Sequence, residues 1–341
     1  MIDPAASFTG LVDLASASLG GRAIGTNDDF FASIDNLVLP GRGVFVEGKF
    51  TDRGKWMDGW ESRRKRVAGH DWCVLELGAA GQVLGFDVDT NHFIGNAPSF
   101  ASVEGARAPR GAPLDELARV AWVELLGQSP LRPGSQNLFA AHASELVTHV
   151  RLNIFPDGGV ARFRVFGRVH PDWTPPELDA ETAAHVTAGM VDLAAVKNGG
   201  LALACSDAFF GPMNNLLLPG RAENMGGGWE TRRKRGPGYD WILLQLGARG
   251  APRIVELDTN HFKGNFPDRA SLEWIDAPGA RITDLVESGT WAPLLPETNL
   301  KAHTRHFYRD ALVPAAPATH VRVNIFPDGG LSRVRIWGER P

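Results

Sequence analysis

The sequence predicts an all-β protein that consists of two antiparallel β-sandwich domains in tandem. The sequence contains an internal duplication. One example is the segment 148–167, THVRLNIFPDGGVARFRVFG, which recurs at 319–338 as THVRVNIFPDGGLSRVRIWG. Short runs of alternating apolar and polar residues lie between Gly- and Pro-rich turns, a pattern typical of half-buried strands. Each copy has roughly 150 residues, the size of a complete domain and far longer than a solenoid repeat.

The two copies align almost without gaps and define the predicted domains. Asp13–Arg42 matches Asp192–Arg221, and Trp60–Phe139 matches Trp229–Tyr308, with a ten-residue insertion in the first copy between Gly43 and Trp56. We therefore expect a first repeat over 1–170, a proline-rich linker over 171–185 and a second repeat over 186–341.

The strongest strand signals lie in the repeated segments. His149–Phe155 alternates, a Pro-Asp-Gly-Gly turn follows, and Ala161–Val165 alternates again, which predicts a β-hairpin in each copy. Two further apolar strands, Trp72–Leu77 and Val83–Val88, are separated by Gly-Ala-Ala-Gly. Helical spacing is confined to short pieces such as Leu114–Leu126.

Composition narrows the class of partner and the compartment. A net charge of −4 gives no global field that would attract nucleic acid or an anionic membrane, so we expect a small-molecule partner. The two cysteines, Cys73 and Cys205, lie at non-equivalent positions, which excludes a disulfide framework and favours a reducing compartment. Without a signal-peptide pattern at the start or a long apolar stretch, the sequence predicts a cytoplasmic protein.

The first candidate motif is Asp-Thr-Asn-His, at 89–92 in the first copy. On a strand, Asp87, Asp89 and Asn91 would share one face and His92 would lie on the other. Such acceptors can bind the N–H groups of a ligand, and histidine can move a proton near neutral pH. A structural role, with Asx residues capping a turn, stays open. The second copy supplies the equivalent set, Glu256, Asp258, Asn260 and His261.

The second candidate motif is Trp-Glu-Ser/Thr-Arg-Arg-Lys-Arg, at 60–66 and 229–235. Arginine can bind a carboxylate through two parallel hydrogen bonds, and a nearby glutamate can orient it or take a proton. The alternative is a solvated basic face or a nucleic-acid patch. Arg151 and Arg322 are anion-binding candidates if their strand lines a cleft. The motif candidates are Glu61, Arg63, Arg64, Glu230, Arg232 and Arg233.

Several familiar motifs are absent. Gly43–Lys49 resembles a phosphate-binding loop, but Phe50 stands where the magnesium-binding Ser or Thr belongs. The sequence contains no HExxH, CxxC or GxSxG. It assigns no cofactor, and a divalent metal bound through His and Asp stays open because no known ligand spacing occurs.

Taken together, the motifs resemble the allantoicase family. The resemblance rests on GWESRRKR, HDW, DTNHFxGN, WxxLLP, HTRHF and THVRxNIFPDGG, and it extends from about Asp13 to Gly338. It implies two jelly-roll domains of the galactose-binding-like type that assemble as a homo-oligomer. It also implies hydrolysis of allantoate to ureidoglycolate and urea in purine degradation.

The resemblance suggests roles for the candidate residues. We expect His92 or His261, assisted by Glu61 or Glu230, to transfer the proton. The motif arginines would bind the substrate carboxylate, and the Asp and Asn side chains would bind its ureido groups. His303 and His306 would also bind substrate, although the first copy has Gly134 and Asn137 in their place.

Two questions stay open at this stage, one about the site and one about the function. The first copy is either degenerate or part of a composite site between the repeats or subunits, and we favour the composite site. Two other functions also fit the residues. One is a noncatalytic carbohydrate-binding protein, and the other is a hydrolase of another ureide such as ureidoglycolate.

Overall fold

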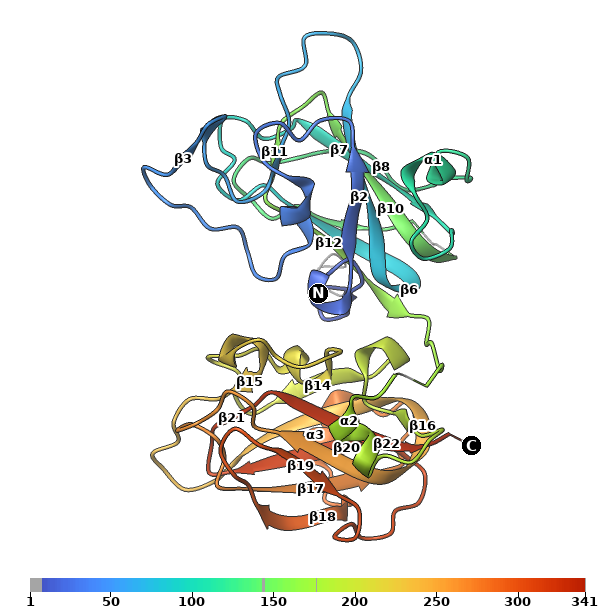
Figure 1. The fold of residues 1–341 in the computed structure, drawn as a ribbon, viewed down its shortest axis with the longest axis vertical. Coiled ribbons are helices and arrows are strands. Elements are labelled where there is room, and N and C mark those ends of the chain that lie inside the picture. The colour runs from blue at the N-terminus through green and yellow to red at the C-terminus, as the bar shows by residue number, and fades with distance from the viewer. Residues whose placement is uncertain (1–7, 143–144, 176, 341) are drawn as a thin grey trace. The chain divides into compact units, whose positions relative to one another are not determined.

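The computed structural model describes residues 8–142, 145–175 and 177–340. The chain divides between His170 and Pro171 into two compact units, and strands form most of the regular structure in both (Figure 1). The predicted all-β fold of two tandem jelly-roll β-sandwiches is confirmed. No helix among the described residues is long and apolar enough to cross a membrane.

The described residues of the first unit form twelve strands, one short α-helix and two 3-10 helices. The helical pieces are η2 (Ala17–Leu19), η3 (Ile34–Val38) and α1 (Leu114–Leu117). The strands are β1 (Val12–Asp13), β2 (Arg22–Thr26), β3 (Phe50–Thr51), β4 (Gly54–Lys55), β5 (Trp60–Glu61), β6 (Asp71–Asp89), β7 (Phe100–Ala106), β8 (Val123–Pro130), β9 (Leu138–Ala140), β10 (Leu146–Phe155), β11 (Gly159–Val160) and β12 (Arg162–Val169).

The second unit repeats this order without counterparts of β3 and β4 among its described residues, because those two strands lie in the segment of the first copy that carries the insertion. Its helical pieces are α2 (Ala180–His185), η4 (Val196–Asn198), η5 (Met213–Leu217), η6 (Met225–Gly227) and α3 (Ile282–Glu287). Its strands are β13 (Val191–Asp192), β14 (Leu201–Cys205), β15 (Trp229–Glu230), β16 (Asp240–Asp258), β17 (Arg269–Ile275), β18 (Ala292–Asn299), β19 (Arg305–Tyr308), β20 (Ala318–Phe326), β21 (Gly330–Leu331) and β22 (Arg333–Glu339).

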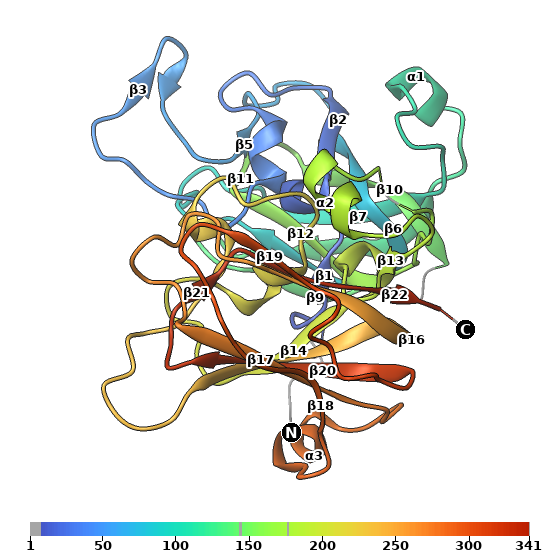
Figure 2. The same cartoon turned by 60° about the horizontal axis from the view of Figure 1, so that its bottom comes forward.

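One long strand joins the two layers of each sandwich. The first part of β16 pairs with β14 and β20, and its last part pairs with β22 and β19. Strands β17 and β18 extend the first layer, and β13 extends the second. Figure 2 shows these two layers of the second unit. In the first unit, β6 joins β2 and β10 to β12 and β9 in the same way.

The predicted pair of strands around Gly-Ala-Ala-Gly is wrong, because both belong to the single strand β6. The segment is a bend, where the register with β10 shifts between Val147 and His149. Glycine permits the close approach there, since a Cβ on Gly81 would lie 2.4 Å from the carbonyl oxygen of Arg168. The bend lets one strand serve both layers.

The predicted hairpin after His149–Phe155 is also wrong. Strand β10 pairs with β6 and β7, whereas β12 pairs with β6 and β1, so the two strands lie in different layers. The Pro-Asp-Gly-Gly segment carries the chain across the sandwich, and β11 pairs with β5 on the way. The predicted apolar face is nevertheless correct, because Val150, Leu152 and Ile154 are fully buried.

The helical spacing over Leu114–Leu126 predicts too long a helix. Only Leu114–Leu117 is α-helical, and Val123–Pro130 forms β8, which pairs with β7. Leu125 is buried in this strand. Tertiary pairing has overridden the local 3.6-residue period.

Residues 171–185, expected as a linker, include helix α2. The Asp179 carboxylate caps the helix by accepting a hydrogen bond of 2.8 Å from the backbone N–H of Thr182. Leu178 and Val186 flank the helix and pack with Ile254 and Trp337 of the second unit. The segment therefore brings polar groups onto the second sandwich.

The glycine before Leu331 gives a direct test of the packing. A Cβ on Gly330 would lie 1.9 Å from the buried ring of Phe262, whereas a Cβ on Gly264 would meet nothing within 4 Å. We expect Gly330→Ala to lower the free energy of unfolding by about 1–3 kcal/mol or more, and Gly264→Ala to change it little. Equal destabilisation of the two variants in urea denaturation would contradict this packing.

Candidate functional site

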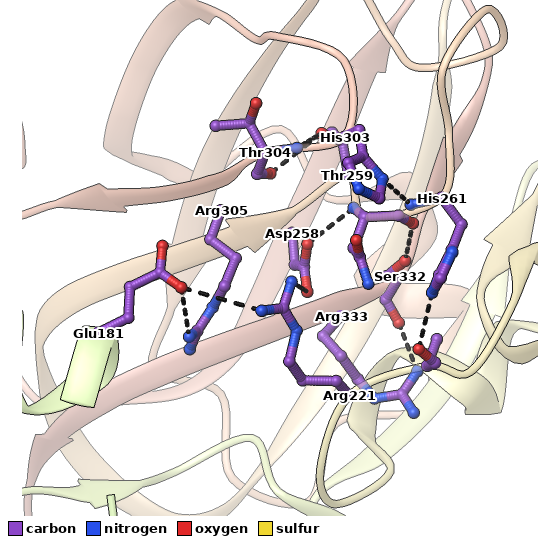
Figure 3. A network of polar contacts seen from close by, with 12 residues as sticks. Glu181, Arg221, Asp258, Thr259, His261, His303, Thr304, Arg305, Ser332 and Arg333 are labelled. Carbon is purple, nitrogen blue, oxygen red and sulfur yellow. Dashed lines mark hydrogen bonds and ion pairs between the residues drawn. The ribbon is translucent and has the colours of Figure 1, made fainter. Parts of the chain in front are cut away.

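The second unit contains a cavity of about 440 Å³ whose lining residues all belong to that unit. Strands β16, β19 and β22, the segment before α2 and the loop ending at Arg221 form its walls. Figure 3 shows part of this polar network. The charged residues that matter below are Arg221, Glu256, Asp258, Arg305, Arg333 and Arg335.

The pairing of the strands brings opposite charges together. Glu256 and Asp258 are two residues apart on β16 and therefore share a face. Arg335 and Arg333 lie directly opposite them on β22, and Arg305 lies opposite Asp258 on β19. A central row of carboxylates is thus flanked by guanidinium groups on both neighbouring strands.

Arg305 contacts several acidic and polar side chains at the cavity wall. Its guanidinium lies 2.7 Å from Glu256 and donates to Asp179 at 3.0 Å, to Glu181 at 3.1 Å and to the Thr182 hydroxyl at 2.6 Å. Burial lowers the pKa of Arg305, but the surrounding carboxylates raise it further, so that the net shift is upward. Desolvation raises the pKa of Glu256 despite this partner.

Two other arginines position the loop at the cavity wall. Arg335 donates to the carbonyl of Leu218 at 2.7 Å and to that of Gly220 at 2.9 Å. Arg333 donates to the carbonyls of Gly220 at 3.2 Å and Gly227 at 2.7 Å. Desolvation lowers the pKa of the buried Arg333 to about 10. These bonds hold the backbone next to Arg221.

Asp258 is the one proposed site residue that lines the cavity, and its motif neighbours lie beside it. It accepts a hydrogen bond of 2.7 Å from the backbone N–H of Asn260. The ring of His261 donates from Nε2 to the carbonyl of Ala222 at 2.9 Å, and its backbone N–H donates to Nδ1 of His303 at 2.8 Å. The motif therefore lies against the loop that carries Arg221 (Figure 3).

The predicted alternation of Asn91 and His92 on opposite faces is wrong. Strand β6 ends at Asp89, and His92 has a φ of 68°, in the left-handed region. Both side chains consequently reach the same carbonyl, that of Gly43, at 2.9 Å from Asn91 and 3.2 Å from His92. His261 has the same turn, with a φ of 71°.

Both ring nitrogens of His306 form hydrogen bonds. Its Nε2 accepts from the backbone N–H of Lys301 at 2.9 Å, and its Nδ1 donates to the carbonyl of Leu257 at 3.1 Å. Desolvation lowers its pKa. The ring is therefore held neutral, with its tautomer set by these two bonds.

The Trp-Glu-Ser/Thr-Arg-Arg motif has the same geometry in both units and lies outside the cavity lining. Arg63 pairs with Asp28 at 2.6 Å, and Arg232 pairs with Asp207 at 3.0 Å. Arg64 and Arg233 are exposed. The glutamates bond the last residue of the DTNHFxGN motif: Glu61 accepts from Asn96 at 2.7 Å, and Glu230 accepts from Asn265.

In the first unit, the equivalent carboxylates, Asp87 and Asp89, accept hydrogen bonds from different partners. Arg42 makes a bidentate contact with Asp89, at 2.9 and 3.0 Å. Asp87, the counterpart of Glu256, accepts from the Gln136 side chain at 2.7 Å and from the backbone N–H of Asn137 at 3.2 Å. Burial raises the pKa of Asp87 to about 6.

Sequence reasoning left several cavity residues out of the proposed site. Glu256 alternates with Asp258 along the predicted strand, and this spacing could have placed Glu256 in the site. Arg305 stands inside His-Thr-Arg-His, and Arg221 ends the first aligned block. Asp179 and Thr182 gave no such signal, because they lie far from Arg305 in the chain.

Metal binding was left open by the sequence. Within the described ranges, no group of three or more His, Cys, Asp or Glu side chains is placed to hold a metal ion.

The raised pKa of Asp87 predicts a pH-dependent stability. Between its unfolded value near 3.8 and its folded value of about 6, the folded state holds the proton more tightly, so raising the pH through this window destabilises the fold. From pH 4 to pH 7, wild type should lose about 2–3 kcal/mol of unfolding free energy relative to Asp87→Asn.

Urea denaturation at the two pH values measures this difference. Asp52→Asn, at an exposed position, serves as the control and should run parallel to wild type. A constant difference between wild type and Asp87→Asn would show that Asp87 does not titrate in this window.

The fold and the site define a duplicated β-sandwich protein with a polar cavity suited to a small charged molecule. The family model Allantoicase repeat matches residues 12–170 and 191–341, so each unit carries one copy. The chain belongs to the allantoicase family.

Known relatives match along the whole chain. A probable allantoicase 1 from Burkholderia mallei is 45% identical over 328 residues, covering 96% of this chain and 94% of the relative. A probable allantoicase from Photobacterium profundum is 46% identical and covers 99% of both chains. The crystal structure of allantoicase from Saccharomyces cerevisiae, 33% identical, superimposes with a TM-score of 0.81 over 99% of this chain and 98% of that one.

Proposed function

We propose that this protein is an allantoicase, which hydrolyses allantoate to ureidoglycolate and urea in purine degradation. The observation that carries the proposal is the similarity to proteins named allantoicase over almost the entire chain, with both repeats matched. Noncatalytic carbohydrate binding and hydrolysis of another ureide are the alternatives that the experiment below must exclude.

The cavity has groups suited to this substrate. Allantoate carries one carboxylate and two ureido groups on a single carbon. Guanidinium groups can bind the carboxylate, and carboxylates such as Asp258 can accept hydrogen bonds from the ureido N–H groups. In the reaction, the oxygen of water bonds to the central carbon and water loses one proton, the C–N bond breaks, and the leaving urea nitrogen gains a proton.

The residue roles follow the motifs. We assign proton transfer to His261 or its counterpart His92, with Glu230 or Glu61 in support. The placement of His261 against the loop that carries Arg221 supports this role. The remaining proposed substrate-binding residues are Arg63, Arg64, Arg232, Arg233, Asp89, Asn91, Asp258, Asn260, His303 and His306.

The proposal extends to the setting of the enzyme. We place it in the cytoplasm, which agrees with two free cysteines, Cys73 and Cys205. We also propose a homo-oligomer, as the resemblance to the family implies.

Urea release from allantoate by the purified protein tests the function, with ureidoglycolate followed in parallel and a chelated sample alongside. Equimolar urea and ureidoglycolate are expected. Release of urea from ureidoglycolate but not from allantoate would support the other ureide hydrolase. Glycan binding without any turnover would support the noncatalytic alternative, and loss of activity with chelator would establish a metal requirement.

The histidine assignment predicts a large loss of turnover. Replacing both His92 and His261 with asparagine, which tolerates their left-handed backbone, should lower kcat about 100-fold or more. The exposed His142 provides the control, and His142→Asn should keep wild-type kcat. Wild-type turnover in the double variant would remove the histidines from the mechanism.

A further inference from the structure

The two units contain the same arginine–aspartate pair in different states. In the first unit, Arg42 contacts Asp89 through two hydrogen bonds of 2.9 and 3.0 Å. In the second unit, the equivalent Arg221 lies 3.8 Å from Asp258 and 3.8 Å from Glu181. Within the described part of the chain, the Arg221 guanidinium donates no hydrogen bond. The arginine and the aspartate are therefore hydrogen-bonded in the first unit and separated in the second.

Arg221 is therefore unlike the other arginines of the cavity. Arg305 donates to three acidic side chains and a hydroxyl, and both Arg333 and Arg335 donate to backbone carbonyls. Each of these three arginines has at least one donor engaged within the fold. Among the described residues, Arg221 is the one of these four whose guanidinium makes no hydrogen bond, and its side chain is 46% exposed, so all its donors can meet a ligand.

A second difference concerns the charge behind Arg221. In the first unit, Arg162 is buried against Asp58, with guanidinium–carboxylate distances of 2.8 and 3.0 Å. The second unit has Gly227 at the position of Asp58, and the equivalent Arg333 meets only its backbone carbonyl there. Among the described residues, no carboxylate forms an ion pair with Arg333.

These differences leave two guanidinium groups near Asp258 without a close carboxylate contact. Glu256 is paired with Arg305 at 2.7 Å, and Asp192 with Arg335 at 3.6 Å. Asp258 then faces the guanidinium groups of Arg221 and Arg333, and Glu181 lies as far from Arg221 as Asp258 does, at 3.8 Å. A buried unpaired cation is costly, and a ligand anion would compensate it. Burial lowers the pKa of Arg333, and the neighbouring charge of Arg335 lowers it further.

We propose that the second unit alone binds the substrate carboxylate, with Arg221 as the binding residue and the charge of Arg333 behind it. The Arg42–Asp89 pair of the first unit is then structural, and each chain has one carboxylate site. The inference deepens the proposed function and rests on it in taking the anion to be allantoate. It assigns the carboxylate to Arg221 rather than to the motif arginines.

The missing carboxylate of the second unit can be restored. Gly227→Asp places there the residue that pairs with the buried arginine in the first unit, and Gly227→Ala adds the same Cβ without charge. A Cβ on Gly227 would lie 3.1 Å from the Cβ of Ala222, so both variants share this contact. Their difference reports the added carboxylate.

Direct binding is measured by calorimetry with N-carbamoylglycine, which carries one ureido group and one carboxylate. Wild type and Gly227→Ala should bind one molecule per chain with affinities within about twofold, and Gly227→Asp should bind about tenfold or more weakly. Arg221→Gln should show a similar loss. Equal affinity of Gly227→Asp and Gly227→Ala, two molecules per chain, or no binding to wild type would overturn the proposal.

Kinetics then identify the bound anion. N-carbamoylglycine should inhibit urea release from allantoate competitively, and Gly227→Asp should raise KM more than it lowers kcat. Noncompetitive inhibition would place the anion outside the substrate site and contradict the assignment. Absence of allantoate hydrolysis by wild type would refute the proposed function separately, because the calorimetric test does not depend on turnover.

Discussion

The structure depends on a row of buried carboxylates on the long strand that joins the two layers of each sandwich. Asp87 and Asp89 in the first unit, and Glu256 and Asp258 in the second, are each at most 3% exposed. Buried carboxylates are costly without partners, so the neighbouring strands and loops must supply donors. The two units meet this requirement with different residues, and in the second unit the row lines a cavity.

Divergence after duplication explains how one copy can be structural and the other functional. In the first unit, Asp58, Arg42 and Gln136 complete compact contacts around the row. In the second, Gly227 lacks a carboxylate, while Arg305 binds Glu256 and the segment before α2. Arg221 is thereby left beside the cavity with no carboxylate closer than 3.8 Å, where an anionic ligand can reach it.

The sequence was sufficient for the duplication, the sandwiches and the apolar faces, because repeats and period-two alternation are local signals. It could not predict that β10 and β12 lie in different layers, since alternation does not identify a pairing partner. The sequence also did not predict the left-handed turn at His92 or the contact of Arg305 with Asp179. The first depends on one backbone angle, and the second joins residues far apart in the chain.

A crystal structure with N-carbamoylglycine bound would test the central claim most directly. We predict that its carboxylate lies within hydrogen-bonding distance of Arg221 in the second unit, while Arg42 keeps both of its bonds to Asp89. A ligand carboxylate bound by Arg42 in the first unit, or by Arg232 or Arg233 outside the cavity, would contradict the account.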